Sequence, residues 1–175
     1  MNWIFSKCSS LKNLNLNKFN TDNVVYMNNM FYECSSLTEI NLSKFNADNV
    51  LYMNSMFCGC SSLKEINLSN FNTNKVINMA GMFFDCLSIK EINISHFNIN
   101  NAKYMNSMFK NCTSLIEVKL PNFNSDNKID MELMFSRCTN ELKIKIKSQY
   151  KNIKENAFKD SSYVPNKLKK VNYIL

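Results

Sequence analysis

Glycine, proline, histidine and tryptophan are scarce in this sequence. The 175 residues include two glycines, two prolines, one histidine and one tryptophan. With only Gly59 and Gly81, the chain has no glycine-rich loop for a nucleotide phosphate, and neither a P-loop nor a dinucleotide-binding motif is present. With His96 as the single histidine, the paired-histidine zinc motif of metalloproteases is absent, and so is a nucleophile elbow. The sequence therefore predicts that the protein is not an enzyme.

The sequence also has no long apolar run. A membrane-spanning helix needs roughly 18 consecutive apolar residues, and no segment approaches that length. The first ten residues, MNWIFSKCSS, have neither the basic start nor the apolar stretch of a signal peptide. We therefore expect no transmembrane segment in this chain.

A strict internal repeat is the main feature that the sequence does have. The segment MFYECSSL, which starts at Met30, returns with small changes as MFCGCSSL, MFFDCLSI and MFKNCTSL, which start at Met56, Met82 and Met108. Recurrence points first to architecture, because one active site needs each of its residues only once. A fixed step of this length is typical of a solenoid whose units stack along one axis. The columns that keep this step include Cys8, Cys34, Cys60, Cys86, Cys112 and Cys138, and Phe5, Phe31, Phe57, Phe83, Phe109 and Phe135.

Each unit has two halves with different apolar patterns. In residues 23–34, NVVYMNNMFYEC, the apolar positions are 3, 3, 1 and 3 residues apart, which predicts one stripe of a helix. In residues 36–46, SLTEINLSKFN, the apolar positions Leu37, Ile40 and Leu42 predict a short strand. Stacked strands lie about 4.8 Å apart whereas packed helices need about 8 to 10 Å, so we expect a curved array with its strands on the concave side.

The unit, written L-x-x-I-x-L-S-x-F-N-x-x-N-V-x-x-M-x-x-M-F-x-x-C-x-S-L, resembles the 26-residue leucine-rich repeat of BspA-like surface proteins, including the large mycoplasma surface-protein group. The match covers residues 1 to about 147. The resemblance implies an α/β leucine-rich-repeat solenoid, curved, with short parallel strands on the concave side and helices on the convex side. It also implies a non-catalytic module for adhesion or protein binding at a cell surface, and it supplies no functional residues that carry over to this chain.

The location of the protein has two interpretations. The family resemblance implies the cell surface or the extracellular space. Met1 already stands in the methionine column of the repeat, so we interpret the chain as a piece of a longer array. The alternative is an intracellular protein–protein scaffold that uses the same concave face, which the missing signal peptide and the many free cysteines favour. Both interpretations predict a protein partner, and they leave its identity and the oligomeric state open.

The chain changes character after Cys138, where the repeat register slips in TNELKIKIK. We therefore divide it into a repeat solenoid at 1–140, with about five and a half units starting mid-repeat, and a basic C-terminal cap at 141–175. The first part carries 12 basic and 11 acidic side chains, whereas the cap carries nine lysines and three acidic residues. Because no aromatic series for base stacking is interleaved with these lysines, we do not expect nucleic acid as the partner.

Within the cap the sequence predicts three short elements. We expect a strand near Lys143–Lys147, a short helix near Tyr150–Phe158 and a last extended segment at Val171–Ile174. Pro165 should break the chain between the last two, because proline cannot donate a backbone hydrogen bond.

The cysteines and methionines suggest core packing rather than a disulfide ladder or a metal site. Cysteines on adjacent helices should lie about 8 to 10 Å apart, beyond the roughly 7 Å between Cα atoms that a disulfide spans. Zinc needs four ligands gathered locally, and the sequence offers one C-x-C pair, Cys58 and Cys60, and one histidine. Met27, Met30 and Cys34 have the soft sulfur that Cu(I) prefers, but such side chains are ordinary core filling. We expect no cofactor, and we expect the out-of-register Cys58 to be the accessible, reactive thiol.

The candidate binding face is formed by the columns that point outward from the strands. Side chains alternate between the two faces of a strand, so rows of equivalent residues are exposed together. Neighbouring glutamates in such a row repel one another unless they form ion pairs with lysines or bind a cation or a basic partner. We therefore predict that this face binds a protein partner. Its residues are Glu39, Glu65, Glu91 and Glu117, Asn41, Asn67 and Asn93, and Lys64 and Lys90.

Overall fold

The computed structural model describes residues 1–124 and 128–161. The expected break at Pro165 and the expected extended segment Val171–Ile174 lie outside these residues. In chain order the elements are the strands β1 (Glu39–Asn41), β2 (Glu65–Asn67), β3 (Glu91–Asn93) and β4 (Glu117–Lys119), the helix α1 (Asn140–Gln149) and the 3-10 helix η1 (Glu155–Phe158).

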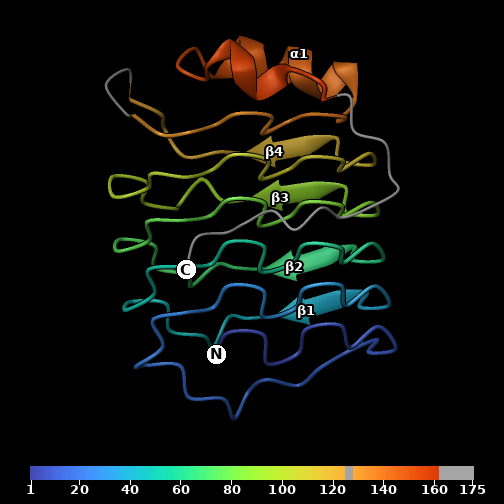
Figure 1. The fold of residues 1–175 in the computed structure, drawn as a ribbon, viewed down its shortest axis with the longest axis vertical. Helices are drawn as coiled ribbons and strands as arrows, with labels where there is room; N and C mark the ends of the chain where they lie inside the picture. Colours follow the sequence, from blue (N-terminus) through green and yellow to red (C-terminus); the bar gives the residue numbers. More distant parts are fainter. Residues whose placement is uncertain (125–127, 162–175) are drawn as a thin grey trace.

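The repeats form a stack of units, with the four strands in one column along it (Figure 1). β1 pairs with β2 and β3 with β4, both in parallel and in the register of the repeat, so that Ile40 lies opposite Ile66. In β1, Ile40 is buried while Glu39 and Asn41 are exposed, as period-two alternation predicts. The leucine-rich-repeat solenoid with short parallel strands is therefore confirmed. A second ladder of isolated parallel bridges joins Tyr26, Tyr52, Asn78, Tyr104 and Asp130.

The other half of each unit is a run of tight turns, and the helix predicted there is wrong. Met27, Phe31 and Cys34 are fully buried, so the apolar positions do form core. Within the described residues of the repeats, however, none lies in an α-helix. Alternate N–H groups bond to the next unit instead, as Met27 N–H does to Tyr52 O and Phe31 N–H to Met56 O, each at 2.8 Å. The N–H groups between them close turns onto the carbonyl three residues back.

Two residues in each run of turns have a left-handed backbone, which explains why no helix forms there. In the second unit they are Asn29 and Glu33, both at φ 56°. A left-handed residue cannot continue a right-handed helix, and glycine adopts this conformation without steric cost. Both glycines of the chain occupy these two columns, Gly59 at φ 76° and Gly81 at φ 59°.

The units keep a short spacing on the turn side of the stack as well. Phenylalanine rings of neighbouring units stack with centroids 5.4 to 5.7 Å apart, for example Phe31 on Phe57 at 5.4 Å. This is close to the distance of about 4.8 Å between paired strands and well below the 8 to 10 Å of packed helices. The predicted convex layer of helices is therefore absent from the described repeats. The expected curvature and the expected separation of the cysteines both depended on a helix spacing of about 8 to 10 Å, which does not apply here.

Each registered cysteine from the second unit onward makes a specific contact between units. Cys60 Sγ donates to Phe31 O at 3.1 Å, and Cys86 Sγ donates to Phe57 O at 3.2 Å. All seven cysteines are free thiols. The weak S–H donor thus satisfies a carbonyl of the preceding unit, which an aliphatic side chain of similar size cannot do. The same contact is made by Cys34, Cys112 and Cys138 at 3.0, 3.0 and 3.1 Å.

α1 and η1 close the end of the stack. The Thr139 hydroxyl caps α1 by accepting from Leu142 N–H at 3.2 Å. The strand predicted near Lys143–Lys147 is wrong: the alternation in ELKIKIK reads as a strand, but Leu142 and Ile146, four residues apart, are buried on one helix face. The short helix predicted near Tyr150–Phe158 contains η1, and the division of the chain at residue 140 stays a prediction.

Candidate functional site

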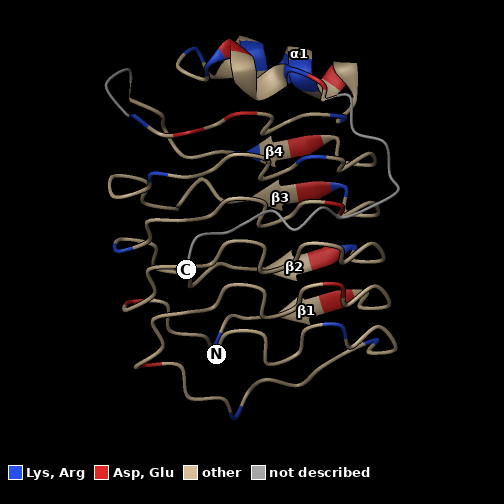
Figure 2. Cartoon of the chain, viewed as in Figure 1, with Lys and Arg blue, Asp and Glu red and all other residues tan. Residues whose placement is uncertain are grey.

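The strand side of the stack carries the predicted glutamate row. Glu39 lies opposite Glu65, and Glu91 lies opposite Glu117. Figure 2 shows these acidic positions one above another at the start of each strand. The first three glutamates are exposed, and Glu117 is half-buried. The structure therefore brings the four predicted glutamates together on one side of the molecule.

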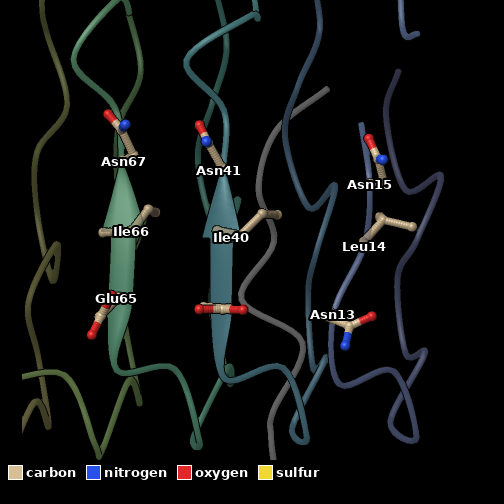
Figure 3. A pocket seen from close by; sticks show the side chains of 9 residues that line it. Asn13, Leu14, Asn15, Ile40, Asn41, Glu65, Ile66 and Asn67 are labelled. Carbon is tan, nitrogen blue, oxygen red and sulfur yellow. The ribbon is translucent and has the colours of Figure 1, made fainter. Parts of the chain in front are cut away.

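A hollow of about 550 Å³ lies over the first part of this face. Three neighbouring chain segments form it, each presenting one aliphatic residue between two polar ones (Figure 3). Leu14 and Ile66 are half-buried, so part of their apolar surface is open to solvent. Two carboxylates and no cation line the hollow. Its residues are Asn13, Leu14, Asn15, Glu39, Ile40, Asn41, Glu65, Ile66 and Asn67.

The asparagine row lies beside the glutamates and is fixed by local turns. Asn41, Asn67 and Asn93 are exposed. Each side-chain Oδ1 accepts from the serine N–H two residues along the chain, at 2.9, 3.0 and 3.1 Å. In residues 1–124 and 128–161, none of the hydrogen bonds uses the Nδ2 of these three residues. Their amide donors are therefore oriented by the backbone and available to a partner.

The predicted lysine neighbours do not pair with the row. Lys64 and Lys90 are exposed, and in the described part of the chain neither forms an ion pair within 4.0 Å. Glu117 does form ion pairs, with Lys145 of α1 at 3.4 Å and with Lys119 at 4.0 Å. The other three glutamates of the row have no cationic partner among the described residues.

Cys58 is buried, so the prediction of an accessible thiol at this position is wrong. The residue is 7% exposed. Tyr32 and Phe84 hold the same position in the units on either side, and both have larger side chains than cysteine. Burial raises the pKa of the Cys58 thiol, and the negative charge of Asp85 raises it further. The exposed cysteine is Cys8.

Sequence reasoning missed the contribution of the first unit to the hollow. Asn13 and Leu14 line it although neither was predicted as a site residue. The signal was present in the repeat, because they precede Glu39 and Ile40 by one full repeat step. Asn13 has no charge, so the glutamate row begins at the second unit.

The described residues contain neither a membrane-spanning helix nor a cluster of metal ligands. In residues 1–124 and 128–161, no helix is long and apolar enough to cross a bilayer. Over the same residues, no group of three or more histidine, cysteine, aspartate or glutamate side chains is placed to hold a metal ion.

Comparison with known proteins identifies a repeat family. A family model described as "Mycoplasma protein of unknown function, DUF285" matches residues 1–67 and 37–150, which together span most of the chain. No curated protein matches the sequence. Among solved structures, the T. pallidum leucine-rich repeat protein TpLRR is similar, with 14% sequence identity, a TM-score of 0.35, and coverage of 85% of this chain and 86% of that chain.

Proposed function

The chain belongs to the DUF285 family of mycoplasma repeat proteins, and from this membership and its exposed strand face we propose that it is a non-catalytic protein-binding solenoid for adhesion or recognition at a cell surface. Repeat solenoids of this kind present extended surfaces to which partners bind. Protein binding without catalysis is also consistent with the missing nucleotide, zinc and nucleophile motifs.

The strand face is the observation that carries this proposal. Its polar rows stand on strands whose positions are fixed by main-chain pairing between units. The hollow of about 550 Å³ combines exposed carboxylates, oriented amides and half-buried aliphatic surface. A fixed surface of mixed chemistry suits a protein partner, because little conformational entropy is lost when it is bound.

An intracellular scaffold is the second candidate function. Seven free thiols favour it, since free cysteines are typical of reducing compartments. Six of these thiols are buried, however, and behave as small apolar side chains in either environment. The same strand face serves both functions, so the location of the protein distinguishes them.

A photo-cross-linking amino acid at Asn67 tests the strand face. This residue is exposed and lines the hollow. The control position is Lys103, which is also exposed but lies next to the separate bridge ladder at Tyr104. Cells that produce the protein should give a cross-linked partner from position 67 and none from position 103. Equal products from both positions, or none from either, would count against binding at this face.

Surface labelling of intact cells tests the location. An antibody or an added protease should reach the native protein before the cells are permeabilised. Access only after permeabilisation would overturn the surface role and favour the intracellular scaffold.

A further inference from the structure

Three glutamates on the strand face carry negative charge that no group in the described chain neutralises. Glu39, Glu65 and Glu91 are exposed and have no ion pair in residues 1–124 and 128–161. Parallel register places Glu39 next to Glu65, where like charges on adjacent strands repel one another. A ligand that supplies cations at the spacing of the units would remove this repulsion.

Glu117, the last glutamate of the row, shows how a cation from outside the repeats binds to the row. Lys145 belongs to α1 and not to a repeat, and its Nζ lies 3.4 Å from Glu117 Oε2. α1 lies across the end of the stack (Figure 1). The row therefore already accepts one lysine from a helix, and the three remaining positions have the same side chain in the same column.

We propose that the partner binds this face through a basic α-helix that runs along the stack axis, with one lysine or arginine per turn over Glu39, Glu65 and Glu91. This inference rests on the proposed protein-binding function and names the chemistry of the partner surface. As in helix-in-groove recognition, the anchors stand at i, i+4 and i+7 on one face of the helix, but here they are charged and not apolar.

The spacing of the units favours a helix over an extended segment. The paired strands β1 and β2, which carry Glu39 and Glu65, lie about 4.8 Å apart. β2 and β3 are not a hydrogen-bonded pair, but the phenylalanine rings of neighbouring units stack 5.4 to 5.7 Å apart along the whole stack. Successive turns of a helix repeat every 5.4 Å or so, which differs by roughly 0.6 Å per step and is within the reach of flexible lysine side chains. Alternate residues of an extended peptide are about 6.6 Å apart, so they lose register within two steps.

The surroundings of the row suit long basic side chains. The half-buried Leu14 and Ile66 in the hollow offer apolar surface to the methylene stems of lysine or arginine. The free amide donors of Asn41 and Asn67 can bond to acceptors between the anchors. Lys64 and Lys90 are exposed at the edge of the row. They repel a basic helix that moves sideways from the glutamates, and this repulsion defines the position of the helix on the face.

Two designed peptides test the proposal against the full chain. The probe is an alanine-rich helical peptide of about 20 residues, labelled with a fluorophore, with lysines at i, i+4, i+7 and i+11 on one face. The control peptide has the same composition and its lysines spread around the helix. Fluorescence anisotropy at low salt should show at least about fivefold tighter binding of the one-face peptide, because only that peptide pairs with all three glutamates at once.

Matched protein variants locate the binding. The triple variant E39Q/E65Q/E91Q should bind the one-face peptide about tenfold more weakly than the unmodified chain, since three exposed charge pairs are lost. The control is the double variant E132Q/E141Q, because both glutamates are exposed and lie outside the strands. Its affinity should be unchanged. Circular dichroism of each variant confirms that the fold is intact.

Equal affinity for both peptides, or unchanged affinity of the triple variant, would overturn the basic-helix proposal. The cross-linking result at Asn67 then separates two failures. A partner that still cross-links at this position leaves protein binding at the strand face in place and shows that the partner uses other chemistry. Loss of that cross-link as well would remove the proposed function itself.

Discussion

The Phe158 ring of η1 stacks on the Phe135 ring of the last repeat, with centroids 5.5 Å apart and an interplanar angle of 13°. This is the geometry of a contact between two repeats, since Phe109 stacks on Phe135 at 5.5 Å and 16°. Along the chain, Phe158 follows Phe135 by slightly less than one repeat step. η1 therefore takes the place of a further unit in a shortened form.

Main-chain contacts of the cap follow the same principle. Phe135 N–H bonds to Ala157 O at 2.8 Å, where an earlier unit would bond to the next repeat. Arg137 N–H bonds to the Asp160 carboxylate at 2.6 Å. Leu120 N–H bonds to the Tyr150 hydroxyl at 3.0 Å. Cap groups of different chemistry thus satisfy backbone donors of the last two units.

Removing the Phe158 ring should destabilise the whole stack from this end. Phe158 is 8% exposed, and we expect F158A to lower the free energy of unfolding by about 3 kcal/mol, because both the buried apolar area and the ring contact are lost. Chemical denaturation followed by circular dichroism measures the change. F158L is the control: it keeps an apolar side chain and should cost about half as much. A loss below about 1 kcal/mol for F158A would show that the cap contributes little.

Asp160 should make the stability of the cap depend on pH. It accepts a hydrogen bond from the Lys143 ammonium at 2.7 Å, and this interaction, with the Arg137 N–H, lowers the pKa of Asp160 below its ordinary value. Because the folded-state pKa is the lower one, the stabilisation is present above the unfolded pKa and is lost as the pH falls through the folded pKa. D160N should therefore lower the Tm at pH 7 by a few degrees, and the difference should vanish well below about pH 4.

A double-mutant cycle identifies the partner of Asp160. K143M should have a smaller effect in the D160N background than in the unmodified chain, because the ion pair is already broken. Additive effects at neutral pH, or a Tm difference that persists in acid, would contradict the assignment.

Thiol labelling should distinguish one cysteine from the other six. Cys8 is exposed, while burial raises the pKa of the Cys58, Cys60 and Cys86 thiols and leaves little reactive thiolate at neutral pH. A small thiol reagent should label one site per native chain, and peptide mapping by mass spectrometry should place it at Cys8. All seven should react after denaturation. Rapid native labelling of Cys58 would contradict the burial described above.

Replacing Leu133, which has a strained left-handed backbone, should stabilise the protein. Leu133 has φ 57° and is half-buried, and asparagine adopts this conformation at lower cost. We expect L133N to raise the free energy of unfolding by about 0.5 kcal/mol, after allowing for some lost apolar contact. The matched control is L87N, at a surface leucine without a left-handed backbone. If the two variants change stability equally, backbone strain at Leu133 is not the cause.

Much of the strand side could be predicted because the same alternation returns in every unit. Glu39, Ile40 and Asn41 alternate in burial, as period-two patterns in strands do. Alternation alone is not specific, since ELKIKIK forms part of α1. The constant repeat step predicted that the four glutamates lie together, as the strand pairing shows. Asn13 stands one repeat step before Glu39 and so belongs to the same column, although we did not include it in the predicted binding face.

The turn side could not be predicted from apolar spacing, because that spacing suits two structures. The buried Met27, Phe31 and Cys34 fit a helical stripe as well as a series of turns. The distinguishing signal is the backbone preference of the residues between them. Gly81 and Asp85, four residues apart, both have a left-handed backbone, which glycine adopts without steric cost and aspartate more readily than most residues. The periodicity shows that Cys58 lies outside the registered cysteine column, but it does not report that the side chain is buried.

The cysteine contacts have a consequence for how such a chain can change in length. Cys60 Sγ bonds to Phe31 O and Cys86 Sγ to Phe57 O, so each link joins a unit only to its neighbour. Duplication or deletion of one whole unit re-forms every link with an equivalent residue. Insertion of a single amino acid shifts the cysteine, the ring and the backbone donors together and breaks all of them at one junction. The fold therefore tolerates genetic gain or loss of complete repeats and resists smaller changes in length.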